Sequence, residues 1–175
     1  MDIRDNHFEL FGLPVGFAID GAALDAAYRE LQNRVHPDKF ATGSDVEKRV
    51  ALQWAARANE AYRSLRDPAK RAAYLCELGG ADWHARSNSP MSPEFLVQQM
   101  EWRESLEEAE AAGDTAALER LDSDGKEARS VLLDRIEQLL DRHNDIEQAS
   151  QCVRQLMFLE KFAEEVGDAF ERFEA

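Results

Sequence analysis

Two residues that could transfer protons or bind a metal stand on either side of a proline in the segment RVHPDKFATGS, residues 34–44. A catalytic pair of His36 and Asp38 would need a pocket that excludes water and adjusts both pKa values. A zinc or iron site would need three or four ligands converging from several elements. Two other roles are open: a contact on another protein, or a local role in which Pro37 ends a helix and Asp38 caps a turn.

The chain offers few further ligands for a metal or catalytic site. The other histidines, His7, His84 and His143, are scattered, and no HxxxH or HxxE pattern surrounds the loop. Cys76 and Cys152 have no CxxC neighbour, so neither a disulfide framework nor a structural zinc site is expected. We therefore expect no metal, no cofactor and no catalytic activity of the chain's own.

Helical periodicity places the loop between two long helices. A short helix is expected around residues 7–13, and a long one after Asp20, a favourable N-cap. The long helix cannot continue far past Val35, because a residue before a proline is pushed out of the helical region. Its apolar stripe repeats at helical spacing and comprises Leu24, Ala27, Tyr28, Leu31 and Val35.

A second long helix follows the loop. It opens with the capping box Ser44-x-x-Glu47 and extends to about Leu65. Its expected apolar face comprises Val50, Trp54, Ala58, Ala61, Tyr62 and Leu65. Two such helices joined by a short loop predict an antiparallel hairpin with the loop at its solvent-exposed tip. A short helix after the sequence RDP, with Ala72, Ala73, Leu75 and Leu78 as its apolar residues, completes this part of the chain.

Composition divides the chain into two halves. The segment LGGADWHARSNSPMSPE, residues 78–94, is rich in glycine, serine and proline and is typical of a linker. We assign residues 1–78 and 92–175 to two domains and residues 79–91 to the linker. The first 78 residues carry 11 Lys/Arg and 12 Asp/Glu, a net charge of −1, whereas residues 79–175 carry 10 and 23, a net charge of −13. The acidic half lacks a basic stripe for phosphates, so nucleic acid is not an expected partner.

Three longer helices are expected after the linker. The first runs from the N-cap Ser92 to Gly113, the second from about Asp114 to about His143, and the third from a capping box that begins at Asn144. Three consecutive amphipathic helices with short turns predict a three-helix bundle, and the fold class is therefore all-α. No apolar run approaches the roughly 18 residues of a membrane helix, so no membrane partner is expected.

A small basic surface borders the loop. Arg29 and Arg34 lie on the outward side of the preceding helix, and Lys39 lies in the loop. A short helix, a helical hairpin and His-Pro-Asp at its tip resemble the J-domain. The resemblance implies that the loop triggers ATP hydrolysis in a DnaK-type chaperone and that the basic helix pairs with an acidic surface of that chaperone. The implied chaperone-binding residues are His36, Pro37, Asp38, Lys39, Arg29 and Arg34.

Motifs beyond the loop are similar to one family of J-domain proteins. The chain resembles the HscB family over nearly its whole length. The segments that carry the resemblance are HFELFGLP, HPDKF followed by ATGS, RDPAKRAAYL and FLVQQMEWRESLEEA. The resemblance implies a cytoplasmic co-chaperone in iron–sulfur cluster biogenesis, monomeric on its own. Its implied partners are an HscA-type DnaK-like chaperone and an IscU-type scaffold. Two alternatives stay open: a J-domain protein for a different client, and a hydrolase that uses His36 with helix-borne carboxylates.

The helix after Ser92 carries two apolar surfaces instead of one. At about 100° per residue, Trp102, Leu106 and Ala109 fall within about 40° of Phe95 and form a core stripe with it. A second group, offset by about 100–200° and bordered by charged residues, comprises Leu96, Val97 and Met100. An amphipathic helix ordinarily has one apolar stripe and a polar back, so the second group is a candidate binding surface.

The last helix repeats this anomaly at Phe158. Its core stripe is expected to comprise Ala149, Val153, Leu156, Ala163, Val166 and Phe170. Phe158 lies opposite that stripe, and is therefore expected to be exposed or packed on something else. If the two helices are adjacent, these side chains form one surface with apolar anchors and a charged rim. The resemblance to HscB implies that this surface binds the scaffold through Leu96, Val97, Met100, Glu101, Arg103, Glu104 and Phe158.

Overall fold

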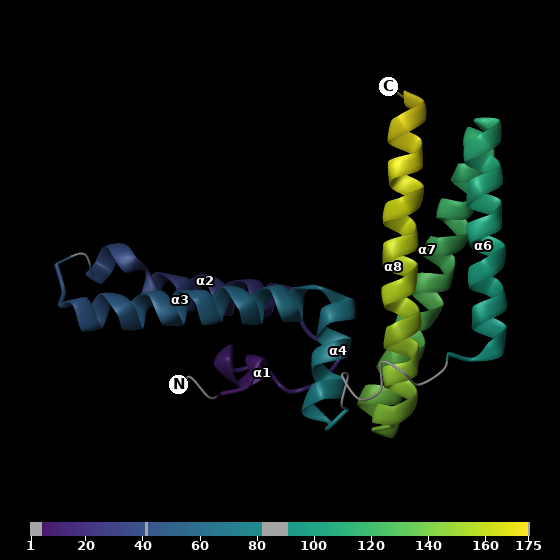
Figure 1. Ribbon diagram of the computed structural model, residues 1–175. Helices are drawn as coiled ribbons and strands as arrows, with labels where there is room; N and C mark the ends of the chain where they lie inside the picture. The colour runs from purple at the N-terminus through teal and green to yellow at the C-terminus, as the bar shows by residue number, and fades with distance from the viewer. Residues whose placement is uncertain (1–4, 41, 82–90, 175) are drawn as a thin grey trace. The chain divides into compact units, whose positions relative to one another are not determined.

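The computed structural model describes residues 5–40, 42–81 and 91–174, and all regular structure within them is helical (Figure 1). The all-α prediction is confirmed. The chain separates into two compact units, Met1–Leu75 and Cys76–Ala175. Most of the predicted linker lies outside the described residues. No helix in the described part of the chain is long and apolar enough to span a membrane.

The first unit contains a short helix α1 (His7–Leu10), the hairpin helices α2 (Gly21–Val35) and α3 (Asp45–Arg66), and most of α4 (Pro68–Leu78). The predicted caps are present. The Asp20 carboxylate accepts two backbone N–H groups at the start of α2, and Ser44 and Glu47 form a reciprocal capping box on α3. These caps satisfy backbone donors that the helix cannot satisfy internally, and so determine where each helix begins.

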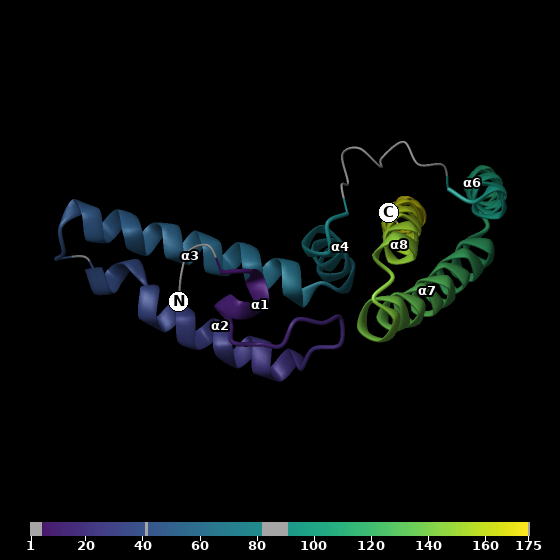
Figure 2. The ribbon, with the colours of Figure 1, turned by 90° about the horizontal axis from the view of Figure 1, so that it is seen from below.

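Helices α2 and α3 lie side by side as a hairpin (Figures 1 and 2), and side chains from both hold it together. The rings of Tyr28 and Tyr62 stack with their centroids 4.1 Å apart. The Asn59 side-chain oxygen accepts hydrogen bonds from the Tyr28 hydroxyl at 2.7 Å and from the Gln32 amide at 2.5 Å. The buried apolar residues of the pair are Leu24, Leu31, Val35, Ala51, Ala58, Ala61 and Leu65. Two different restraints, an apolar seam and a polar clamp, thus keep α2 and α3 in register.

The structure corrects the predicted apolar face of α3 at one position. Val50 was expected in the core but is exposed, whereas its neighbour Ala51 is buried. Ala51, Ala58 and Leu65 repeat every seven residues, so the buried stripe passes through position 51. Leu78, one of the apolar residues predicted for the short helix, ends α4 and is also exposed.

The second unit is the predicted three-helix bundle. It contains α6 (Pro93–Ala112), α7 (Thr115–Glu137) and α8 (Ile146–Glu174), with a π-helical turn η2 (Gln138–His143) between the last two. Figure 2 shows α6 and α8 nearly end-on, with α7 beside them. The core shared by the three helices comprises Leu106, Ala109, Leu118, Leu121, Phe162, Val166 and Ala169.

Two local predictions for α8 are wrong. Asn144 does not cap the helix: it adopts a left-handed conformation with φ of 50°, and the Asp145 carboxylate accepts the N–H of Gln148 instead. The cap therefore lies one residue later than predicted. Ala163, expected in the core stripe, is exposed, because the buried side of α8 shifts toward α6 in the second half of the helix.

Candidate functional site

The His-Pro-Asp loop is a short, locally restrained turn. His36 ends α2 in an extended conformation, and Pro37–Phe40 forms a single 3₁₀ turn, η1. The Lys39 N–H donates to the His36 carbonyl at 3.0 Å. The Asp38 N–H donates to Nδ1 of the His36 ring at 3.3 Å, and that nitrogen lies 3.5 Å from the Asp38 carboxylate.

The loop is open to solvent. The His36 side chain is 53 % exposed and that of Asp38 is 90 % exposed. Within the described residues, no group of three or more histidine, cysteine or acidic side chains is arranged to hold a metal ion. Acid–base catalysis needs walls that exclude water, and these side chains are largely accessible to it. The geometry suits contact with another macromolecule and counts against the hydrolase alternative.

Exposed cations flank the loop on α2. The Arg29 Nε donates to the Asp25 carbonyl at 3.1 Å, so part of this side chain lies along its own helix. Arg34 lies in the last turn of α2, where the helix dipole favours a positive charge. Five residues separate the two arginines, which places them about 140° apart around the helix. They therefore border the outward surface of α2 on two sides instead of forming one row, and Lys39 extends the positive charge into the loop.

The second candidate surface begins on α6. The side chains of Leu96, Val97 and Met100 are exposed, with Met100 at 71 % of its full accessible area. Leu106 and Ala109 are buried on the other side of the helix, as predicted. The charged residues expected to border the apolar group, Glu101, Arg103 and Glu104, are all exposed. The helix does have two apolar surfaces, only one of which packs into the bundle.

Phe158 connects this surface to α8, and of its two predicted outcomes, exposed or packed on another element, the structure has the second. Its ring is half-buried, edge-on to Phe95 at 5.7 Å and stacked with Trp102 at 6.3 Å and Phe162 at 6.1 Å. The residue is therefore not on a free face of α8. It fills the space between α8 and α6 because α8 packs against α7 on one side and α6 on another. The two helices are adjacent at this point, as the predicted joint surface requires.

Arg103 links the aromatic cluster to the charged border. Its guanidinium lies 5.7 Å from the centre of the Phe158 ring and 3.8 Å from the Glu165 carboxylate. Cation–π contact and ion pairing together orient the arginine over the ring. Sequence reasoning missed Glu165. Its position seven residues after Phe158, and therefore on the same side of α8, is the signal that could have identified it.

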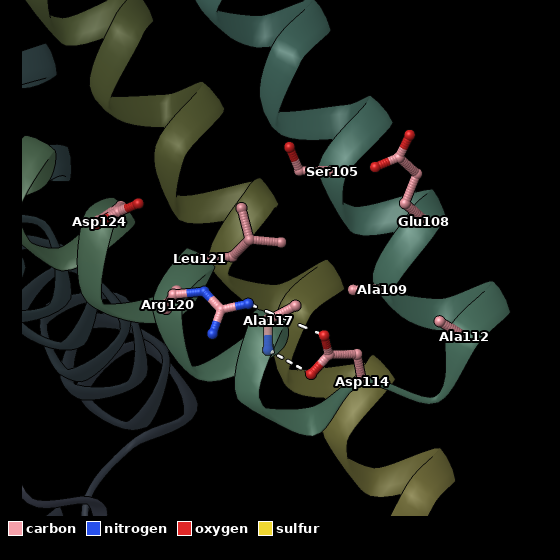
Figure 3. Close-up of a pocket in the computed structure, with 9 residues that line it drawn as sticks. All are labelled: Ser105, Glu108, Ala109, Ala112, Asp114, Ala117, Arg120, Leu121 and Asp124. Carbon is pink, nitrogen blue, oxygen red and sulfur yellow. Dashed lines mark hydrogen bonds and ion pairs between the residues drawn. The ribbon is translucent and has the colours of Figure 1, made fainter.

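A groove of about 480 Å³ lies between α6 and α7 (Figure 3). Its floor is formed by alanines and Leu121. At its edge the Asp114 carboxylate accepts the Ala117 N–H at 2.9 Å and lies 3.9 Å from Arg120. These contacts cap the start of α7, and none of the predicted site residues lines the groove.

An exposed His-Pro-Asp turn at the tip of a helical hairpin, followed by an acidic three-helix bundle, is the arrangement of a J-domain co-chaperone. Residues 91–167 match the family model described as the HSCB C-terminal oligomerisation domain. The co-chaperone protein HscB homolog of Burkholderia multivorans is 53 % identical over 174 residues, which cover 99 % of both chains. The homolog of Burkholderia thailandensis is 51 % identical over the same share.

Solved structures agree with these sequence relatives. The chaperone HscB from Vibrio cholerae matches with a TM-score of 0.85 and 38 % identity, over 97 % of this chain and 99 % of that one. The human co-chaperone HscB matches with a TM-score of 0.89 and 29 % identity, over 95 % of this chain and 83 % of that one. The chain belongs to the HscB co-chaperone family.

Proposed function

We propose that this protein is the co-chaperone of iron–sulfur cluster biogenesis that stimulates the ATPase of an HscA-type, DnaK-like chaperone. His36, Pro37 and Asp38 act on the chaperone, while Lys39, Arg29 and Arg34 attract its acidic surface. The observation that carries the proposal is the exposed, hydrogen-bonded His-Pro-Asp turn at the tip of a locked hairpin, in a chain of the HscB family.

The C-terminal bundle is the part that binds the cargo, an IscU-type scaffold. Leu96, Val97 and Met100 provide apolar anchors, and the rim comprises Glu101, Arg103 and Glu104, with Phe158 at the junction with α8. Exposed apolar side chains inside a charged border are what a modest protein interface needs. In this assignment residues 1–78 form the J-domain, residues 79–91 the linker, and residues 92–175 the scaffold-binding domain.

The protein acts as a cytoplasmic, monomeric adaptor without catalytic activity of its own. It brings the scaffold to the chaperone, and the chaperone's ATP cycle drives cluster transfer. The cluster is cargo held by the scaffold. Both cysteines are buried, and burial raises the pKa of each thiol above its ordinary value, which disfavours the thiolate that an iron ligand requires.

One substitution tests the chaperone half of the proposal. His36→Gln removes the ring that accepts the Asp38 N–H but leaves the bundle unchanged. Stimulation of the purified chaperone's steady-state ATPase is expected to disappear, whereas the scaffold binds with unchanged affinity in titration calorimetry. Undiminished ATPase stimulation by the variant contradicts the proposed role of the loop. Loss of scaffold binding as well indicates that the variant is misfolded or that the two functions are not separate.

A further inference from the structure

Two ion pairs join α6 to α8, and they are seven residues apart on each helix. Arg103 on α6 lies 3.8 Å from the Glu165 carboxylate on α8, and the Glu110 carboxylate on α6 accepts a hydrogen bond of 2.6 Å from Arg172 on α8. Both arginines are more than half exposed, and both acids are less than a third exposed. The two pairs are therefore alike in exposure and in the helices that they join, with the charges exchanged between the helices.

The first pair differs from the second in its distance from Phe158. The Arg103 guanidinium lies over the Phe158 ring, 5.7 Å from its centre, so Arg103 contacts both Phe158 and Glu165. Arg172 is fourteen residues beyond Phe158, which corresponds to about 21 Å along α8. Only the first pair thus adjoins the surface proposed to bind the scaffold.

Other carboxylates compete with Glu165 for the guanidinium of Arg103. Both ion pairs line a groove of about 260 Å³, and Glu107 and Asp168 line the same groove. Glu107 follows Arg103 by four residues on α6, and Asp168 follows Glu165 by three residues on α8, so both lie farther from Phe158 along the helices. Helical side chains lean toward the N-terminus of their helix, as Arg103 does when it reaches the ring. Glu165 is therefore the acid that favours this position of the arginine, whereas Glu107 and Asp168 draw it away from the ring.

We propose that Glu165 is a positioning residue of the scaffold-binding surface, and that it acts by holding the Arg103 guanidinium over the Phe158 ring before the scaffold binds. The inference rests on the proposed function, which assigns Arg103 and Phe158 to scaffold binding. Association ordinarily pays an entropy cost for each long side chain that becomes ordered at the interface. Because Glu165 orders the arginine beforehand, it increases affinity without contacting the scaffold itself.

The test compares Glu165→Gln with Glu110→Gln, each in the full chain. Both variants lose one carboxylate of an α6–α8 ion pair and keep the side-chain size, and glutamine is a good helix former. Glu165→Gln is expected to raise the scaffold dissociation constant about fivefold in titration calorimetry, since one arginine must then be ordered on binding. Glu110→Gln is the matched control, with the same change of charge, and is expected to bind the scaffold as the unmodified protein does.

NMR of the protein without scaffold measures the positioning directly. The ring current of Phe158 shifts the resonances of Arg103 side-chain protons that lie over the ring upfield. This shift is expected to disappear in Glu165→Gln and to persist in Glu110→Gln. Exposed ion pairs contribute little to folding stability, so the urea midpoint should be the same in both variants.

A double-mutant cycle tests whether Glu165 acts through Arg103. Arg103→Met removes the guanidinium and keeps an apolar side chain beside the ring. In that background Glu165→Gln is expected to cause no further change in the scaffold dissociation constant, because the group that it positions is absent. The same loss with and without Arg103 would mean that Glu165 contacts the scaffold directly, and would overturn the inference.

The remaining outcomes also decide against the inference. Unchanged affinity in Glu165→Gln removes the positioning role, and an equal loss in Glu110→Gln assigns the effect to the change of net charge. A ring-current shift that persists in Glu165→Gln shows that the ring holds the arginine without the acid. A lower urea midpoint in Glu165→Gln alone assigns the residue to helix packing. If the unmodified protein does not bind the scaffold, the proposed function fails together with the inference; if it binds and only these comparisons fail, the proposed function stands alone.

Discussion

The two candidate surfaces differ in what builds them. The loop surface is polar and is shaped by the backbone, since a proline, one 3₁₀ turn and two local hydrogen bonds hold His36 and Asp38 in place. The α6–α8 surface is apolar and is shaped by packing, since Phe158 is positioned by aromatic rings from α6 and α8. A surface of the first kind can transmit a signal through a few directed contacts, whereas one of the second kind provides affinity through buried area.

The independence of the two surfaces is tested most directly at the apolar anchors of the α6–α8 surface. Leu96→Ala together with Met100→Ala removes two exposed side chains, and each anchor in an interface of this kind contributes roughly 1–2 kcal/mol. The scaffold dissociation constant is expected to rise about 100-fold, measured by titration calorimetry. Chaperone ATPase stimulation in the absence of scaffold should not change. Equal loss of both activities would mean that the two surfaces are not independent.

Phe158 should differ from these anchors because it also packs inside the bundle. Phe158→Ala is expected to lower the free energy of unfolding by about 2 kcal/mol, since it opens space between Phe95, Trp102 and Phe162. Leu96→Ala and Met100→Ala should each stay within about 0.5 kcal/mol of the unmodified protein. Urea denaturation followed by circular dichroism measures the free energy of unfolding of all three variants. A stability loss as small as that of Met100→Ala would show that the aromatic cluster does not hold α6 against α8.

Salt should separate the two surfaces further. Charge attraction between Arg29, Arg34 and an acidic partner is screened as the ionic strength rises. Between 50 and 500 mM salt, the affinity for the chaperone is expected to fall about fivefold, and the affinity for the scaffold less than twofold. Surface plasmon resonance at several salt concentrations gives both values. A steeper salt dependence for the scaffold would reverse the assignment of the polar and apolar surfaces.

A buried histidine makes the hairpin unit pH-sensitive. Burial, together with the nearby Arg57 guanidinium, lowers the pKa of His7 from 6.5 to about 4, while the Glu60 carboxylate opposes the shift. The folded state therefore holds the neutral ring, stacked on Tyr74 at 4.0 Å, whereas the unfolded chain binds a proton below pH 6.5. Stability from this group is complete above pH 6.5 and falls as the pH is lowered toward 4.

Amide hydrogen exchange in α1 and α3, followed between pH 6.5 and 4.5 and corrected for intrinsic rates, measures this effect. His7→Phe keeps a ring against Tyr74 and removes the titration, so its protection is expected to vary less with pH. The bundle helices serve as the internal reference. An identical pH dependence in the variant would assign the effect to carboxylates instead of His7.

Helix starts were largely predictable because capping is local. Asp20, the Ser44–Glu47 pair and Ser92 all cap the helices assigned to them, and Gly113 ends α6 with a φ of 64°. The one cap placed wrongly, at Asn144, has an equally suitable neighbour in Asp145. Local chemistry cannot separate two adjacent cap residues when the π-helical turn before them changes the register.

Burial was less predictable because it depends on which neighbour covers which side. Val50 falls on an apolar arc of α3, but the covering segments do not reach it near the tip. Phe158 is opposite the α7-facing stripe and still packs, because a third helix meets α8 there. A single wheel assumes one buried side, and that assumption fails for a helix with two partners.

By itself, the sequence determined the helices, most of their caps, the restrained His-Pro-Asp turn and the contrast between a nearly neutral and an acidic half. All of these follow from interactions within a few residues or from composition. Only the tertiary structure decided that Arg103 lies over the Phe158 ring and pairs with Glu165, and that Val46 and Val50 are exposed along with Leu96 and Met100. Those outcomes depend on how separate helices approach one another, which periodicity within a single helix does not encode.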